Sequence, residues 1–294
     1  MKLTRQCYHC LSGLIRQAAE LATDDALTRE RAIEEAEELL DSEFSYEQVS
    51  IAVATQIHAV IRDVTRNPDP YRMVKEKEIA VARELCPALS LQAEAGSRRH
   101  GRKQSSLHND DFQRYLRLAA AANPIDFFRQ PDSIRAEVSK PVDFVIDDSQ
   151  RLEARLREAG KILYLADNAG EIYFDLPLVR YLRRFANVIY VVKPSPVQND
   201  ATLEDVKEAG LETEFGAIMA TGVASPGVIF ASVSDEFKWE FESADLIIAK
   251  GMGHYESLSE LPKQGKFFYC LRAKCEPVAE SIGVPLNSYV AMLQ

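Results

Sequence analysis

Long apolar runs are absent from this sequence. No stretch approaches the about 20 consecutive apolar residues that a membrane-spanning helix needs, so we expect no membrane partner. The first residues also lack the apolar core and the small-residue cleavage site of a secretory signal. We therefore expect a cytoplasmic protein.

Positive charge and cysteine are also in short supply. With 35 basic and 45 acidic residues the net charge is −10, which argues against the broad positive field that nucleic-acid binding requires. Five cysteines, an odd number, favour reduced thiols or metal ligands over a disulfide framework. The content of 46% hydrophobic and 27% charged residues is ordinary for a globular protein and does not define an oligomeric state.

The first half of the chain has the apolar spacing of amphipathic helices, from about residue 8 to 120. Apolar residues recur three and four positions apart, as in Leu11, Leu14 and Ile15. We therefore predict an α-helical domain over residues 1–139.

A short basic segment, residues 96–103, lies within this half. It could be a phosphate-steering patch, but a solvated loop is the favoured interpretation for a charge-rich segment that contains glycine.

From about residue 140 the pattern changes to apolar strands that alternate with amphipathic helices. We predict strands near residues 161–166, 188–193, 215–220, 245–249 and 267–271. This alternation is typical of a parallel α/β sheet, so we predict a Rossmann-like domain over residues 140–294. Because such crossovers are nearly always right-handed, the strand ends meet at one edge, where ligands bind in these folds.

Acids, amides, glycines and lysines gather at the predicted strand ends. The first strand is followed by Asp167, Asn168, Gly170 and Glu171. After the later strands come Lys193 to Asp200, Thr221 with Gly222, Lys250 to Gly253, and Arg272 to Lys274. We expect this edge to carry the function.

Asp167, Asn168 and Asp200 offer the carboxylate and amide oxygens that hard divalent cations prefer. Asp200 could instead cap the helix that begins just after it, and Asn168 could simply form a turn. Their positions at matching strand ends favour a metal site. Glu171 is the nearest candidate general acid or base, unless it only hydrogen-bonds substrate or neighbouring amides.

Lys250, Gly251 and Gly253 could cradle a phosphate, because glycines let backbone amides approach an anion that the ammonium group neutralises. The segment lacks both the Walker spacing and the dinucleotide fingerprint, so a plain tight turn is the competing interpretation. Lys274 follows the last predicted strand and could place a second positive charge on the phosphate.

Together these segments resemble the metal-dependent damage-control phosphatases, formerly known as domain of unknown function number eighty-nine. The similarity is carried by residues 167–171, 199–202, 250–256 and 274–275, by 69–71 with Lys75, by 123–126, and by Cys7 to Cys10. It covers nearly the whole chain and most resembles the stand-alone microbial branch, which has a similar length and carries such cysteines.

The resemblance implies a helical amino-terminal region packed on a Rossmann-like domain. It also implies a divalent metal (Mn, Co, Ni or Mg) held by Asp167, Asn168 and Asp200. Members of the family hydrolyse phosphomonoesters such as sugar phosphates or damaged phosphometabolites. The expected partner is therefore a small phosphate ester.

The resemblance further implies a substrate pocket lined by Asn123, Glu171 and the 250–255 loop, with Lys274 on the phosphate. Thr221 joins the expected phosphate-binding residues because it stands at a strand end. His254 is a departure, since family members commonly carry Asn there. It could bond a substrate hydroxyl or simply pack in the loop.

Cys7 and Cys10 lie three residues apart at the start of a predicted helix, so their side chains share a face. With Cys275 or His9 they could form a second metal site, for zinc. A structural zinc site normally needs four ligands and only one such pair exists, so we favour free thiols.

We predict a metal-dependent phosphatase that hydrolyses small phosphomonoesters. The metal would polarise the phosphoryl group, and lysines and loop amides would neutralise its oxygens. Either water or Asp167 could attack, and we favour water. The alternatives are a Rossmann-like methyltransferase, whose glycine-rich first turn is missing here, and a non-catalytic phosphometabolite-binding protein.

Overall fold

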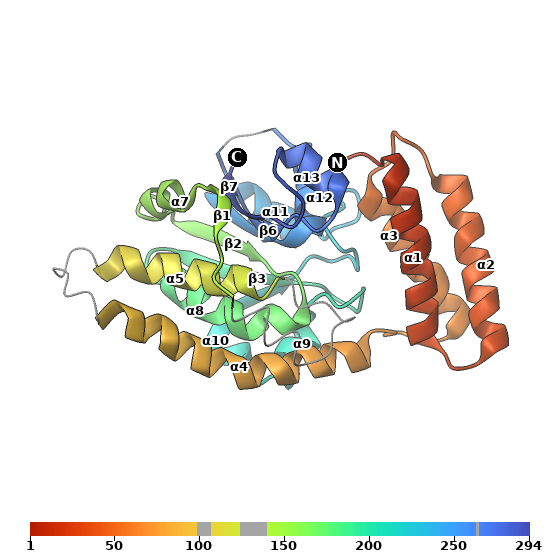
Figure 1. The fold of residues 1–294 in the computed structure, drawn as a ribbon, viewed down its shortest axis with the longest axis horizontal. Helices are drawn as coiled ribbons and strands as arrows, with labels where there is room; N and C mark the ends of the chain where they lie inside the picture. Colours follow the sequence, from red (N-terminus) through yellow and green to blue (C-terminus); the bar gives the residue numbers. More distant parts are fainter. Residues whose placement is uncertain (99–106, 124–139, 263–264) are drawn as a thin grey trace.

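The computed structural model describes residues 1–98, 107–123, 140–262 and 265–294 (Figure 1). Long helices come first: α1 (Arg5–Ala22), α2 (Ala26–Glu43), α3 (Ser50–Thr65), α4 (Arg72–Arg98) and α5 (Leu107–Ala121). Strands and shorter helices then alternate: β1 (Phe144–Asp147), α7 (Ser149–Leu156), β2 (Lys161–Leu165), η1 (Ala169–Glu171), α8 (Ile172–Leu182), β3 (Asn187–Val192), α9 (Leu203–Glu208), α10 (Glu212–Phe215), β4 (Ala217–Ala220), α11 (Asp235–Ser243), β5 (Leu246–Lys250), α12 (Gly251–Leu258), β6 (Phe267–Arg272), α13 (Glu276–Ile282) and β7 (Tyr289–Leu293).

In the described part of the chain, seven strands form one sheet in the order β1-β7-β6-β5-β2-β3-β4. The five predicted strands are confirmed as β2 to β6, and the α/β class with a helical amino-terminal region is confirmed. The sheet is mostly parallel, as predicted, and the exception is β7, which pairs antiparallel with β6. The chain turns back through left-handed backbone at Gly283 and Asn287, which leads it into β7 beside β6.

Both faces of the sheet are buried, as the continuous apolar strands predict. In β2, Ile162 and Tyr164 face one hydrophobic cluster while Leu163 and Leu165 face the other. Helices α4, α5, α7 and α8 contribute to the first cluster, and α11, α12 and α13 to the second. Figure 1 shows α4, α5 and α8 below the sheet and α11 to α13 above it.

Helices α1, α2 and α3 pack around a core of their own and stand at one end of the molecule (Figure 1). This core includes Leu11, Ile15, Ala36, Leu40, Ile57 and Ile61. By contrast, α4 and α5 contribute Cys86 and Phe112 to the core of the sheet. The predicted domain boundary after residue 139 falls outside the described residues and stays a prediction.

Within the ranges that the structure describes, no helix is both long and apolar enough to cross a membrane. Of the basic segment, residues 96–98 are the end of α4, and residues 99–103 lie outside the described part of the chain.

Candidate active site

Asp167 and Asn168 directly follow β2, and backbone hydrogen bonds bring the segment around Asp200 beside them. The Ala201 amide donates to the Asp167 carbonyl at 2.8 Å, and the Ala169 amide donates to the Asn199 carbonyl at 2.8 Å. Asn168 and Asp200 form an antiparallel bridge between these two segments. The three predicted metal ligands therefore come together at one point of the sheet edge.

Asp200 does not cap the helix that follows it, so that alternative is wrong. The N-cap of α9 is Thr202, whose hydroxyl oxygen accepts from the Asp205 amide while the Asp205 carboxylate accepts from the Thr202 amide. This reciprocal capping box satisfies the helix end without Asp200. The Asp200 carboxylate is therefore available for another role.

The Asp200 side chain is buried, and its Oδ2 atom has no hydrogen-bond partner among the described residues. Burial raises the pKa of Asp200 to about 7, although the nearby Lys193 ammonium opposes this rise. The pKa of Asp167 is raised well above its usual range by burial and by the carboxylates of Glu171 and Asp200. Such crowded carboxylates need a compensating cation to be ionised together at neutral pH.

Lys193 was not predicted as a site residue, although it follows β3 directly. Its buried Nζ atom donates to the Gly227 carbonyl at 3.1 Å and to Nε2 of His254 at 3.3 Å. It stands 3.6 Å from Oδ2 of Asp200, beyond ordinary hydrogen-bond distance. Two other acceptors thus hold the ammonium close to Asp200 without a direct hydrogen bond.

His254 is buried and both of its ring nitrogens are engaged. The Lys250 carbonyl can only accept, so Nδ1 carries the hydrogen and donates to it at 2.7 Å. Nε2 is then the acceptor for the Lys193 ammonium. Burial and the Lys193 charge hold the pKa of His254 well below its usual value, which keeps the ring neutral. His254 therefore positions Lys193, and the predicted bond to a substrate hydroxyl has no support here.

Glu171 is fully buried behind the candidate ligands. Its Oε1 accepts from the side-chain amide of Asn168 at 2.7 Å and from that of Asn123 at 3.0 Å. Because the Asn168 amide nitrogen is used in this way, its Oδ1 atom is the one left for a cation. Asn123 also donates to Oδ2 of Asp167 at 2.9 Å. Glu171 and Asn123 thus hold the side chains of the candidate ligands and are not among the residues that line the cavity beside this site.

Lys250 is also fully buried, and its ammonium group is fully engaged. Nζ donates to Oε2 of Glu171 at 2.6 Å, to Oδ1 of Asp175 at 2.7 Å and to the Ala119 carbonyl at 3.0 Å. These three acceptors match its three donors. The predicted phosphate contact of Lys250 is not supported by this network, in which the lysine balances two buried carboxylates.

Gly251 and Gly253 are needed for close packing. Gly251 has φ +77°, and a Cβ atom there would stand 1.9 Å from Oδ2 of Asp167. A Cβ atom at Gly253 would stand 2.1 Å from the Pro226 carbonyl oxygen. The segment begins helix α12, so the strand leads directly into a helix.

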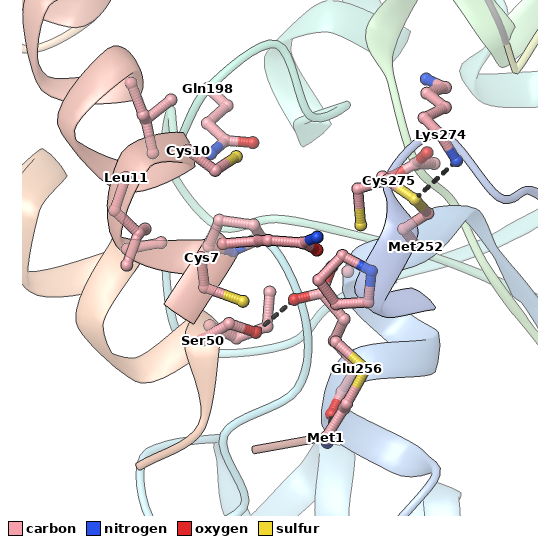
Figure 2. A pocket seen from close by; sticks show the side chains of 18 of the residues that line it. Met1, Cys7, Cys10, Leu11, Ser50, Gln198, Met252, Glu256, Lys274 and Cys275 are labelled. Carbon is pink, nitrogen blue, oxygen red and sulfur yellow. Dashed lines mark hydrogen bonds between the residues drawn. The ribbon is translucent and has the colours of Figure 1, made fainter. Parts of the chain in front are cut away.

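A cavity of about 720 Å³ opens beside the candidate ligands, between the sheet edge and helices α1 and α3 (Figure 2). Of the predicted site residues, it is lined by Asp167, Asn168, Asp200, Gly253, Lys274, Cys7 and Cys10. Asn123, Glu171, Lys250, Gly251, His254 and Thr221 are not among its lining residues. Thr221 instead donates its hydroxyl hydrogen to the Val223 carbonyl at 2.9 Å.

Cys7, Cys10 and Cys275 are free thiols that line the same cavity. Across the described residues, no three His, Cys, Asp or Glu side chains gather in a way that could hold a metal ion. The zinc alternative is therefore unsupported. The Sγ atom of Cys7 instead accepts from the Thr4 amide at 3.3 Å, at the start of α1.

The predicted ligands of the main metal site are two aspartates and one asparagine, so this site contains only two acidic side chains. The third ligand of this site would be the amide oxygen of Asn168. Three observations fit a divalent cation: the buried Oδ2 of Asp200, which has no hydrogen-bond partner among the described residues, the oriented amide of Asn168, and the raised pKa of Asp167. Oxygen donors of this kind suit Mg²⁺ and Mn²⁺.

Sequence reasoning missed the buried partners of this site, Lys193 and Asp175. Asp175 accepts from the hydroxyl groups of Tyr164 at 2.7 Å and Tyr190 at 3.0 Å. An acid inside the apolar helix α8 is a signal that could have pointed to it, because a buried charge requires a partner.

A mostly parallel α/β sheet with a cavity and paired carboxylates at its edge is typical of small-molecule enzymes of Rossmann-like architecture. The family model described as "Damage-control phosphatase ARMT1-like domain" matches residues 3–290. The chain belongs to this family, and it is a phosphatase.

Full-length relatives carry the same name. The chain is 34% identical over 298 residues to "Damage-control phosphatase PH1575" of Pyrococcus horikoshii, with 99% of this chain and 98% of the relative covered. It is 32% identical over 301 residues to a "Damage-control phosphatase" of Archaeoglobus fulgidus, with 99% of both covered. The crystal structure of the Pyrococcus horikoshii protein ph1575 superposes with a TM-score of 0.86 at 34% identity, covering 100% of this chain and 99% of that one.

Proposed function

We propose that this phosphatase is metal-dependent, that Asp167, Asn168 and Asp200 hold its divalent cation, and that it hydrolyses small phosphomonoesters. The observation that carries the proposal is Oδ2 of Asp200, a buried carboxylate oxygen without a hydrogen-bond partner in the described residues, on an aspartate that lines the cavity. A buried carboxylate oxygen without a hydrogen bond destabilises the fold unless a bound ligand interacts with it. Family membership favours this activity over the methyltransferase and the non-catalytic alternatives.

A bound divalent cation would supply Lewis-acid polarisation of the phosphoryl oxygens. Asp167 and Asp200 would contribute carboxylate oxygens and Asn168 its Oδ1 atom. Glu171 and Asn123 fix the Asn168 and Asp167 side chains from behind, as outer partners of metal ligands commonly do. Lys274, on the cavity wall, would balance charge on the phosphate.

Glu171 has no route to the substrate in this arrangement, because it lies outside the cavity lining and both of its oxygens accept hydrogen bonds. We therefore assign it an orienting role and give up its predicted role as general acid or base. We also propose that water is the nucleophile, that the cation is Mn, Co, Ni or Mg, and that the protein is cytoplasmic.

The test is hydrolysis of a generic aryl phosphate by chelator-treated protein, with Mg, Mn, Co or Ni restored one at a time. We expect turnover to vanish after chelation and to return with at least one of these metals. Unchanged turnover in chelator would remove the cation from the proposal. Metal-dependent turnover that survives Asp200→Ala would instead remove Asp200 from the ligand set.

A further inference from the structure

The cavity has two sides of different chemistry. Asp167, Asn168, Asp200 and Lys274 come from loops at the sheet edge. The other side is formed by α1 and α3, which carry none of the proposed reaction chemistry. Figure 2 shows Cys7, Cys10 and Leu11 of α1 across the cavity from Lys274 and Met252.

We call the side of the cavity formed by α1 and α3 the wall. One face of α1 lies along it. Its cavity-lining residues are Gln6, Cys7, Cys10, Leu11, Leu14 and Gln17. The spacing of three and four places them along one side of the helix, over a length of about 16 Å at 1.5 Å per residue. Helix α3 adds Ser50, Ile51 and Ala54. Every side chain that these two helices place on the wall is uncharged, and most are apolar or sulfur-containing.

The charged side chains bordering this wall are acidic, and the nearby Met1 ammonium group donates to the Glu256 carbonyl. Glu256 and Glu276 line the cavity from α12 and α13. The Ser50 hydroxyl donates to Glu256, and the Gln6 side-chain amide donates to Glu276. Two polar groups of the wall are therefore already used by carboxylates. A second anionic group on a substrate would meet these carboxylates without a cation from α1 or α3.

We propose that this wall receives the alcohol part of the substrate, and that the preferred substrates are phosphomonoesters of uncharged, mainly apolar alcohols. The inference rests on the proposed function, because the phosphate must bind at the Asp167 and Asp200 side for the alcohol to reach α1. Each CH₂ group buried on such a wall improves binding by roughly fourfold. Hydroxyl groups that replace water without finding partners weaken it.

Three six-carbon esters test whether the wall prefers an apolar, a hydroxylated or a second anionic group: hexyl phosphate, sorbitol 6-phosphate and hexane-1,6-diyl bisphosphate. With Mn²⁺ present, we expect kcat/KM for hexyl phosphate to exceed both others by at least about tenfold. The sorbitol ester tests the hydroxyl groups and the bisphosphate tests the second anion. Equal or higher kcat/KM for either comparison ester would overturn the proposal.

A charge placed on the wall provides a gain-of-function test. Leu14→Lys, or Gln17→Lys if the first variant is poorly folded, should raise kcat/KM for the bisphosphate relative to hexyl phosphate by about tenfold through ion pairing. Leu21→Lys is the matched control, because Leu21 lies on the same helix and outside the cavity lining. It should leave the ratio unchanged. The same ratio in the wall variant and the control would contradict the placement of the alcohol against α1.

Failure of this inference is distinguishable from failure of the proposed function. If none of the three esters and no aryl phosphate is hydrolysed with any metal, the proposed function fails and the inference falls with it. If the esters are hydrolysed in a metal-dependent manner without preference for the apolar alcohol, only the inference about the wall fails.

Discussion

Gly251 is packed against the carboxylate of Asp167, so closely that a Cβ atom would stand 1.9 Å from Oδ2. Its φ of +77° is also a conformation that side chains other than glycine rarely adopt. Gly251→Ala should therefore displace Asp167 and reduce Mn²⁺ affinity by at least about tenfold, on top of a stability loss of about 1 kcal/mol. Calorimetric titration and thermal unfolding measure the two effects separately.

Gly210 offers the matched control, because its φ is +72° and nothing lies within 4 Å of a Cβ atom built there. Gly210→Ala should carry the same backbone cost and leave Mn²⁺ affinity unchanged. If both alanine variants bind Mn²⁺ like the original protein, the contact between Gly251 and Asp167 does not control the site.

Asp200→Asn keeps the shape of the side chain and removes its charge. In the metal-free protein the folded pKa of Asp200, about 7, lies above its ordinary value of 3.8. The folded state thus binds more protons between these values, and stability falls as pH rises from about 4 to 7. The variant should escape this fall, gaining up to a few kcal/mol near pH 7 relative to the original protein.

With Mn²⁺ present, the original protein should be more stable than Asp200→Asn near pH 7, because Mn²⁺ stabilises only the protein that retains the Asp200 carboxylate. Denaturant unfolding across pH 4 to 8, with and without Mn²⁺, checks both expectations. A variant that Mn²⁺ stabilises as strongly as the original protein would remove Asp200 from the site.

His254 is predicted to control metal binding through Lys193. With Nε2 removed in His254→Leu, the Lys193 ammonium loses one of its two acceptors and can close on Asp200, where it competes with the cation. We expect Mn²⁺ affinity to fall about tenfold. His254→Gln restores an acceptor near the Nε2 position and should keep affinity within about threefold of the original. Equal affinities in the two variants would show that His254 only fills space.

His58 gives a pH prediction away from the cavity. Burial lowers its pKa from 6.5 to about 3, and its Nε2 atom has no hydrogen-bond partner in the described part of the chain. Unfolded protein takes up the proton first, so stability present above pH 6.5 is lost as pH falls toward 3. The loss at pH 4.5 is on the order of 2 to 3 kcal/mol.

His58→Leu should lack this part of the acid sensitivity. Urea unfolding at pH 7 and pH 4.5 provides the comparison. An equal loss of stability in both proteins would show that His58 is not buried in its neutral form.

The sequence allowed the strands to be predicted, and the meeting of the candidate ligands at one edge of the sheet, because both follow from local pattern. Asp167 follows β2 and Asp200 lies in the loop after β3, and right-handed crossovers bring the ends of such strands together. The apolar runs of β2 to β6 were recognisable for the same reason. The four-residue β1 and the antiparallel β7 offered too little pattern, since their pairing depends on a chain reversal near Asn287.

The buried partners of the ligands were not predictable in this way. Lys250 pairs with Glu171 across 79 positions in the sequence, and Lys193 meets His254 across 61. The residues next to a lysine in the sequence do not show whether it binds a phosphate or pairs with a buried carboxylate. That choice depends on which side chains converge after folding, so the sequence indicates a phosphate contact for Lys250 and no role for Lys193.

The most direct measurement is anomalous diffraction at the manganese edge from crystals of the full chain soaked in Mn²⁺. The account predicts one strong peak on the cavity wall, with oxygen atoms of Asp167, Asn168 and Asp200 within about 2.3 Å of it. No peak at that position, or a peak held by other residues, would contradict the assignment of the metal site.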